Sequence, residues 1–298
     1  MDIDVERQHA ARLALIDPLL PADPPLSGDL IATVGALGAP TFREFAPESL
    51  DATWGPLRRH SLTVRLAGAD LGPLLARWEE HLARVVTAGD ADCAAQISWP
   101  SRDTAAVPAL IQHGFAPLAV AAVRRAGVFG PAPAAPDVTI RRATNADLAA
   151  CVALALEVVR YDSQFGLLTE RPSTAEGLRQ NMAELLSRDH PCIWLAVLDH
   201  RPVGIVTVDL PPHSAWIAGR TSASPAAYLG LGGVRADLRG TGIGSALVTH
   251  AHHALDAAGV AVTLLHYAVP NPRSVPFWSI HGYRPLWTSW NRRPALRA

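Results

Sequence analysis

YLGLGGVRADLRGTGIGSAL, residues 228–247, joins a short apolar run typical of a strand to an apolar run typical of a helix. Between the two runs lies Arg239-Gly240-Thr241-Gly242-Ile243-Gly244. Glycines at a strand-to-helix junction let the backbone approach a ligand without interference from Cβ atoms. Successive N–H groups there point at one place, at the positive end of the helix dipole. The stretch therefore predicts a site for a phosphate or a pyrophosphate.

Two common phosphate-binding loops do not match these glycines. A P-loop has a lysine after its last glycine, and this sequence contains no lysine at all. A Rossmann fingerprint reads G-x-G-x-x-G, whereas the third glycine here comes one place early. On this stretch alone, a purely structural role for a glycine-rich helix start remains open.

Two motifs together resemble a known family. The spacing Arg-x-x-Gly-x-Gly from Arg239 to Gly244 resembles the acyl-CoA signature of GCN5-related N-acetyltransferases, the GNAT family. Further along, Asn271-Pro272-Arg273-Ser274, then Phe277-Trp278, then Gly282-Tyr283 resembles the family's Asn-x-x-Ala/Ser…aromatic…Gly-Phe/Tyr element. The resemblance is strong over residues 138–290 and weak over residues 61–125.

The resemblance implies an α/β (α+β) fold, in which a mixed central sheet is flanked by helices. It also implies that the glycine loop binds the pyrophosphate of acetyl-CoA, that the preceding strand pairs with the pantetheine arm, and that a backbone N–H of that strand contacts the thioester carbonyl. The residues expected to bind acetyl-CoA are Gly232, Gly233, Val234, Arg239, Gly240, Thr241, Gly242, Ile243, Gly244, Asn271 and Trp278.

The chain also contains an internal repeat. The run VPALIQHGFAP at residues 107–117 lines up with VPFWSIHGYRP at residues 275–285, and each run follows a predicted strand. This match indicates a tandem duplication. Residues 67–72, AGADLG, stand where a second glycine loop would be and lack both its arginine and its spacing. We therefore expect two GNAT-like domains: a degenerate copy at 1–126, a proline-rich linker at 127–137 and an acetyltransferase domain at 138–298.

The catalytic groups are less clear from the sequence. Where the resemblance places a tyrosine that protonates the departing thiolate, this chain has Trp278, whose indole N–H does not give up its proton. The catalytic candidates are Tyr267, His266 and Asp209. The other groups that could reach the cleft are Tyr228, His213 and Asp162, and Trp216 could line an acceptor pocket.

Composition narrows the range of partners. The formal net charge is −1, which argues against a nucleic-acid surface. The three cysteines are isolated, so neither a disulfide framework nor a metal site is expected. The start of the chain lacks the features of a signal peptide, and no apolar run is long enough for a membrane span. The sequence thus predicts a cytoplasmic protein.

The predicted function is transfer of an acetyl group from acetyl-CoA to the amine of a small molecule, directly within a ternary complex. The alternative is a catalytically weak acyl-CoA sensor or scaffold, which Trp278 and the lack of a carboxylate in residues 215–235 favour. The chain is expected to be a monomer, with its two halves as a pseudo-dimer, or a homodimer.

Overall fold

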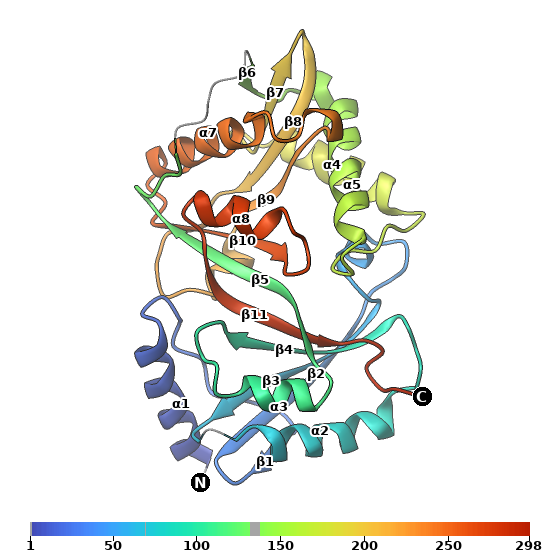
Figure 1. Ribbon diagram of the computed structural model, residues 1–298, viewed down its shortest axis with the longest axis vertical. Coiled ribbons are helices and arrows are strands. Elements are labelled where there is room, and N and C mark those ends of the chain that lie inside the picture. The colour runs from blue at the N-terminus through green and yellow to red at the C-terminus, as the bar shows by residue number, and fades with distance from the viewer. Residues whose placement is uncertain (1, 69, 132–137) are drawn as a thin grey trace. The chain divides into compact units, whose positions relative to one another are not determined.

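The computed structural model describes residues 2–68, 70–131 and 138–298 (Figure 1). Part of the predicted linker, residues 132–137, lies outside this description. The chain forms two compact units. Unit 1 contains Met1–Ala46, Gly55–Ala121 and Pro285–Ala298, and unit 2 contains Pro47–Trp54 and Ala122–Arg284.

Unit 1 is a mixed sheet with helices packed on it. Its strands lie in the order β1-β2-β3-β4-β11-β5, and within it β3 runs parallel to β4 while β11 runs antiparallel to β4. The elements are α1 (Asp2–Ile16), β1 (Ile31–Thr33), β2 (Ala36–Glu44), β3 (Arg58–Leu66), α2 (Gly72–Val85), β4 (Cys93–Pro100), α3 (Val107–Gln112), β5 (Ala116–Arg125) and β11 (Arg284–Arg292).

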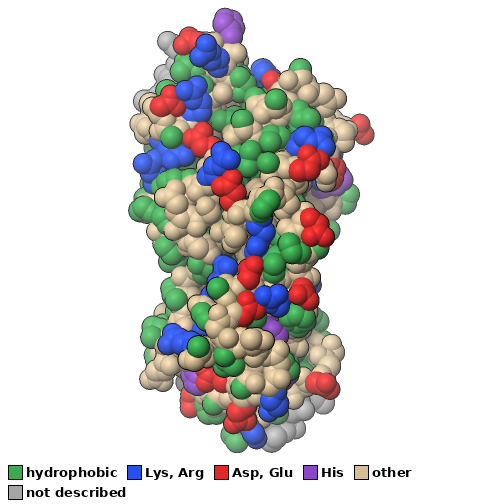
Figure 2. Space-filling view, turned by 90° about the vertical axis from the view of Figure 1, so that its right-hand side faces the viewer, with side chains coloured by type: hydrophobic (Ala, Val, Ile, Leu, Met, Phe, Trp, Pro, Cys, Tyr) green, Lys and Arg blue, Asp and Glu red, His purple; other side chains and the backbone are tan. Residues whose placement is uncertain are grey.

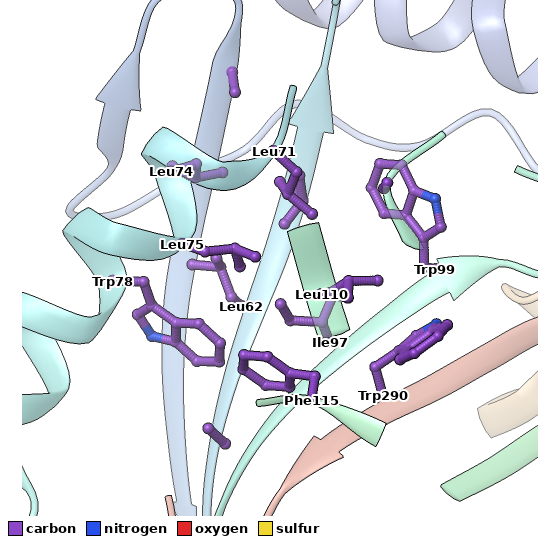
Figure 3. Close-up of a cluster of buried hydrophobic side chains, with 14 of the residues drawn as sticks. Leu62, Leu71, Leu74, Leu75, Trp78, Ile97, Trp99, Leu110, Phe115 and Trp290 are labelled. Atoms are coloured by element: carbon purple, nitrogen blue, oxygen red, sulfur yellow. The ribbon is translucent and has the colours of Figure 1, made fainter. Parts of the chain in front are cut away.

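The core of unit 1 forms where α2 meets the sheet (Figure 3). Apolar residues recur at helical spacing along α2, and Leu74, Leu75, Trp78 and Leu82 are all buried. The ring of Trp78 stacks on that of Phe115, with centroids 5.7 Å apart. The apolar stripe of α2 is thus what fixes the helix to the sheet.

Unit 2 also has strands in mixed directions, in the order β5-β10-β9-β8-β7-β6. Strand β9 runs antiparallel to β8 and parallel to β10. Its remaining elements are η1 (Leu50–Trp54), β6 (Thr139–Arg142), η2 (Asn145–Asp147), α4 (Leu148–Ser163), α5 (Thr174–Ser187), β7 (Ile193–Leu198), β8 (Arg201–Asp209), α6 (Ala215–Ala218), β9 (Ala226–Val234), η3 (Ala236–Leu238), α7 (Ile243–Ala257), β10 (Val262–Ala268) and α8 (Ser274–Ile280).

The repeated run has the same local structure in both halves of the sequence. Gly114 and Gly282 both take a left-handed conformation, with φ of 76° and 84°, at the end of a short helix. The N–H of Phe115 donates to the carbonyl of Leu110 (2.9 Å), and the N–H of Tyr283 donates to that of Trp278 (3.0 Å). Each half also contains a parallel strand pair, β3 with β4 and β9 with β10. The tandem arrangement is therefore confirmed.

The two halves exchange their last strands, so the compact units do not coincide with the predicted halves 1–126 and 138–298, which stay a prediction. The last strand of the second half, β11, pairs with β4 in unit 1, from Trp287 opposite Pro100 to Arg292 opposite Ala95. Strand β5 of the first half continues past Ala121 into unit 2, where it lies beside β10. The runs at 116–125 and 284–292 form strands of ten and nine residues, and the pattern of either run would suit pairing with β4 or with β10. The sequence pattern could therefore not reveal the exchange.

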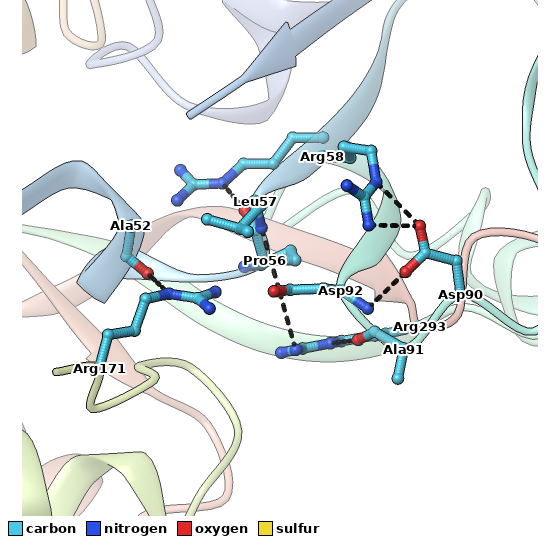
Figure 4. A network of polar contacts seen from close by, with 10 residues as sticks. Ala52, Pro56, Leu57, Arg58, Asp90, Ala91, Asp92, Arg171 and Arg293 are labelled. Carbon is cyan, nitrogen blue, oxygen red and sulfur yellow. Dashed lines mark hydrogen bonds and ion pairs between the residues drawn. The ribbon is translucent and has the colours of Figure 1, made fainter. Parts of the chain in front are cut away.

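Polar contacts fix the turns that flank the strands of unit 1 (Figure 4). The guanidinium of Arg58 bonds the carboxylate of Asp90 (2.8 Å), and Arg293 reaches the carbonyl of Ala91 (2.5 Å). In unit 2, Arg171 donates to the carbonyl of Ala52 (2.7 Å), which holds η1 against the start of α5. On the face shown in Figure 2, arginines and acidic side chains are interspersed.

Candidate active site

The candidate site lies where β9 and β10 separate. The two strands pair only over three residues, from Ala226 opposite Val262 to Tyr228 opposite Leu264. Beyond Tyr228, β9 continues to Val234 and pairs with β8. One edge of β9 between Leu229 and Val234 is therefore open, and an open strand edge can pair with an extended ligand.

The direction of the N–H groups along β9 follows from two bonds to β8. The N–H of Leu231 donates to Oγ1 of Thr207 (2.8 Å), and the N–H of Arg235 donates to the carbonyl of Val203 (2.9 Å). Successive N–H groups of a strand point to opposite edges. The N–H groups of Gly232 and Val234 therefore point to the open edge, as a ligand that pairs with the strand requires.

The glycines of β9 occupy their positions for different physical reasons. A Cβ at Gly230 would lie 2.5 Å from Oγ1 of Thr207, beside the irregularity in the β8–β9 register, and one at Gly233 would collide with Val158 of α4. Packing within the protein therefore requires these two glycines. A Cβ at Gly232 would instead meet the indole of Trp278 at 3.6 Å, an ordinary contact. Gly232 and Trp278 thus face each other on the side of the sheet opposite α4.

The loop before α7 contains the glycines of the predicted phosphate site. Gly240 and Gly242 have φ of 82° and 88°, a conformation that strongly favours glycine, and Gly242 is the N-cap of α7. The N–H of Ala246 makes the first bond of the helix ladder, to the carbonyl of Gly242 (3.0 Å). The preceding N–H groups of the first turn have no partner in that ladder. A Cβ at Gly240 would meet nothing within 4 Å, so the loop has room for an anion.

Arg239 supports the glycine loop with its side chain. Its guanidinium donates to the carbonyl of Val234 (3.1 Å) and lies 3.4 Å from the carboxylate of Glu157 on α4. It also stacks over the ring of Tyr161, 4.5 Å from the centroid. Glu157 in turn accepts the N–H of Ala236 (2.6 Å). These contacts tie the end of β9 to α4.

Asn271 is buried and organises the loop after β10. Its Oδ1 accepts the N–H groups of Arg273 (2.9 Å) and Ser274 (3.3 Å), and its Nδ2 donates to Asp162 (2.8 Å). Burial raises the pKa of the Asp162 carboxyl, although the bond from Asn271 opposes that shift. Contact of Asn271 with the cofactor stays a prediction, since these bonds give the side chain a structural role of its own.

Two of the three catalytic candidates lie around Tyr228. The hydroxyl of Tyr228 is 3.1 Å from Nδ1 of His266, and Asp209 stands opposite Tyr228 on β8. Asp209 is ion-paired with Arg188 at 2.7 Å. Burial, with a smaller contribution from the charge of Arg220, lowers the pKa of His266 to about 4, so its ring is neutral at pH 7. Tyr267 follows His266 along the strand, so its side chain points to the other face.

The corresponding strands of unit 1 also separate, but the helix start there does not suit an anion. Strand β3 pairs with β4 only from Arg58 to Ser61. At the start of α2, Oδ1 of Asp70 accepts the N–H of Gly72 (2.9 Å), so a carboxylate takes up an N–H that a phosphate would need. The N-cap is the buried Leu71, in a right-handed helical conformation.

We therefore expect titration calorimetry to give one CoA bound per chain. In unit 2 the helix start offers open N–H groups, and in unit 1 the Asp70 carboxylate repels a phosphate. A stoichiometry of two would show that the degenerate copy still binds the nucleotide. Asp70→Asn, which removes the charge and keeps the shape, should leave the value at one because the αL glycines are still absent.

Residues 161–283 match the model of the acetyltransferase (GNAT) family. This segment is therefore a GNAT domain. Members of this family are acyl-CoA N-acyltransferases, and their fold binds acetyl-CoA or CoA. Among curated proteins, none matches the sequence.

The GNAT fold also extends over both halves of the chain. A GCN5-related N-acetyltransferase from Sphaerobacter thermophilus is similar with a TM-score of 0.58 and 19% identity, over 89% of this chain and 79% of that one. An acetyltransferase of the GNAT family from Colwellia psychrerythraea has a TM-score of 0.51 and 12% identity, over 74% and 70% of the two chains. At sequence identities this low, the similarity shows the fold alone.

Several residues around the site could not be found from the sequence. Glu157 and Tyr161 contact Arg239 from α4, nearly eighty residues away along the chain, and no motif marks them. In the described ranges, no group of three or more His, Cys, Asp or Glu side chains could hold a metal ion. The helices described there include none that is long and apolar enough to cross a membrane.

Proposed function

We propose that this GNAT protein transfers an acetyl group from acetyl-CoA to the amine of a small molecule, directly within a ternary complex. The observation that carries the proposal is the open edge of β9, which leads from Tyr228 to the αL glycines at the start of α7. A pantetheine arm paired with Gly232 and Val234 would have its pyrophosphate at Gly240 to Gly244. The thioester would then lie near Gly232.

In the proposed reaction, the amine nitrogen forms a bond to the thioester carbon, the carbon–sulfur bond breaks, and a proton passes from nitrogen to sulfur overall. The N–H of Gly232 donates to the carbonyl oxygen as negative charge develops there. His266 takes the proton of the attacking amine on Nε2, while its Nδ1–H donates to Tyr228. Since Trp278 supplies no acid, water protonates the thiolate.

The function is tested by the release of free thiol from acetyl-CoA with a panel of small amines. Turnover with a member of the panel, above the rate of hydrolysis, supports the proposal. Tight CoA binding without turnover of any amine would overturn the proposal in favour of an acyl-CoA sensor, the alternative function that Trp278 favours.

His266→Gln is expected to lower kcat by about 100-fold, the usual contribution of a positioned general base, with unchanged affinity for CoA. His250→Gln, on the face of α7 that meets Trp194, is the matched control and should change little. Because the pKa of His266 is about 4, the acid limb of the kcat/KM profile should follow the pKa of the amine. Unchanged kcat in His266→Gln would contradict the assignment of His266 as the base.

A further inference from the structure

Three rings surround the point where β9 and β10 separate. Trp216, on the short helix α6, meets Tyr228 edge to face, with centroids 4.6 Å apart and planes at 67°. Its ring is nearly parallel to that of His266, with centroids 6.5 Å apart and planes at 16°. Tyr228 and His266 are themselves 5.6 Å apart. We call these residues the aromatic cluster.

The cluster is open to solvent on the side of Trp216. That side chain is 59% exposed, whereas Tyr228 and His266 are half-buried. A tryptophan rarely leaves so much of its ring in water when its neighbours are aromatic, because burial of the ring is favourable. The exposed ring therefore offers a flat apolar surface next to the hydrogen-bonded pair.

The position of the cluster relates it to the proposed reaction. Tyr228 is the last residue of β9 that pairs with β10, and the irregularity of β9 begins two residues later. Tyr228 lies on the face of the sheet that carries Asp209, away from Trp278. An acceptor at the cluster would thus approach the strand opening from the side opposite Trp278.

The groups at the cluster suit an uncharged amine attached to an apolar body. His266 is neutral at pH 7, and burial raises the pKa of Tyr228, so that hydroxyl is neutral as well. Asp209 supplies a carboxylate that is partly exposed and already shared with Arg188. The guanidinium of Arg220 is near enough to affect His266, so the region is not uniformly acidic. Ring faces attract a cation and also stack on another ring.

We propose that the acceptor is a small primary amine whose nitrogen is carried by an aromatic ring through a short alkyl chain. This inference rests on the proposed function. The ring of the acceptor stacks on Trp216, and its amine lies beside Tyr228 and His266 at the opening of the strands. The cluster therefore selects flat acceptors over saturated acceptors of equal size.

The test compares 2-phenylethylamine with 2-cyclohexylethylamine, which have the same carbon skeleton and differ in flatness. The expected kcat/KM is roughly tenfold higher for the aromatic amine, the effect of one stacking contact. Trp216→Ala should abolish this preference, and Trp216→Phe should retain most of it. Ile280→Ala, which shortens another exposed apolar side chain of unit 2, is the control and should keep the preference.

The outcomes separate this inference from the proposed function. Equal turnover of the two amines, or a preference that survives Trp216→Ala, overturns the aromatic class and leaves acetyl transfer intact. Thiol release with aliphatic amines alone would also overturn the aromatic class and leave acetyl transfer intact. CoA binding without turnover of any amine overturns the proposed function, and the assignment of an acceptor falls with it. Calorimetry with the protein saturated in CoA gives a second readout, since 2-phenylethylamine should bind more weakly to Trp216→Ala.

Discussion

Gly242→Asp is expected to reduce the affinity for CoA by at least about 100-fold. The residue is the N-cap of α7, at the place where the first N–H groups of the helix remain open. A carboxylate there would lie within a few ångströms of the pyrophosphate, and repulsion of about 4 kcal/mol per pair of charges is the scale near a protein surface. Titration calorimetry with CoA measures the effect directly.

Gly242→Asn separates charge from backbone strain. Gly242 has φ of 88°, and both aspartate and asparagine tolerate that region better than other side chains do. The asparagine variant should therefore share the strain and lose less than about tenfold in affinity. Equal losses in both variants would mean that conformation rather than charge matters, and unchanged affinity in the aspartate variant would mean that the nucleotide binds elsewhere.

Asp256→Ala is expected to lower the free energy of unfolding by about 3–5 kcal/mol, since it leaves a buried guanidinium without its partner. The side chain of Arg124, on β5, is fully buried and bonds both carboxylate oxygens of Asp256 on α7, at 3.0 and 2.8 Å. The N–H of Gly127 bonds the same carboxylate (2.9 Å). Urea unfolding measures the loss.

The control is Arg125→Met, which replaces the exposed neighbour on the same strand and should change stability by less than about 0.5 kcal/mol. The double variant Arg124→Met/Asp256→Ala should lose less free energy of unfolding than the two single variants lose in sum, because it leaves no unpaired charge. Strict additivity would show that the pair is not coupled.

The ion pair also makes a prediction about pH. Burial opposes ionisation of Asp256, but the bonds from Arg124 and Gly127 outweigh it and lower the pKa of the carboxyl. A carboxyl with a lowered pKa stabilises the fold above its unfolded value, near 3.9, and that contribution is lost as the pH falls through the folded value. The difference in stability between the wild type and Asp256→Ala should therefore shrink below pH 4.

Much of the fold follows from local patterns. The turn before α7 could be predicted because three glycines in five residues precede an apolar helical run, and Gly240 and Gly242 take the αL conformation. Helix α2 could be predicted because its apolar spacing matches a helical period. The exchange of β5 and β11 could not be predicted. The alternation of residues in a strand indicates which face is buried, but it does not indicate which strand lies beside it.

The site was predictable only where a motif fixes the backbone. The glycine loop could be recognised because its residues are consecutive in the sequence. Tyr228 and His266 lie 38 residues apart in the sequence and come together only because their strands are neighbours in the sheet. No sequence motif marks such a pair. Gly233 illustrates a further limit, since its packing against Val158 and a role toward the cofactor both favour glycine.

The exchanged strands have a consequence for synthesis on the ribosome. The strand between β4 and β5 in unit 1 is β11, which comes from residues 284–292 near the end of the chain. Residues 1–121 therefore leave the ribosome long before the strand that completes their sheet. Until then, the edge of β4 is exposed to other nascent chains. Chains that stop before residue 284 should accordingly be bound by chaperones to a greater extent than chains that lack only the last few residues.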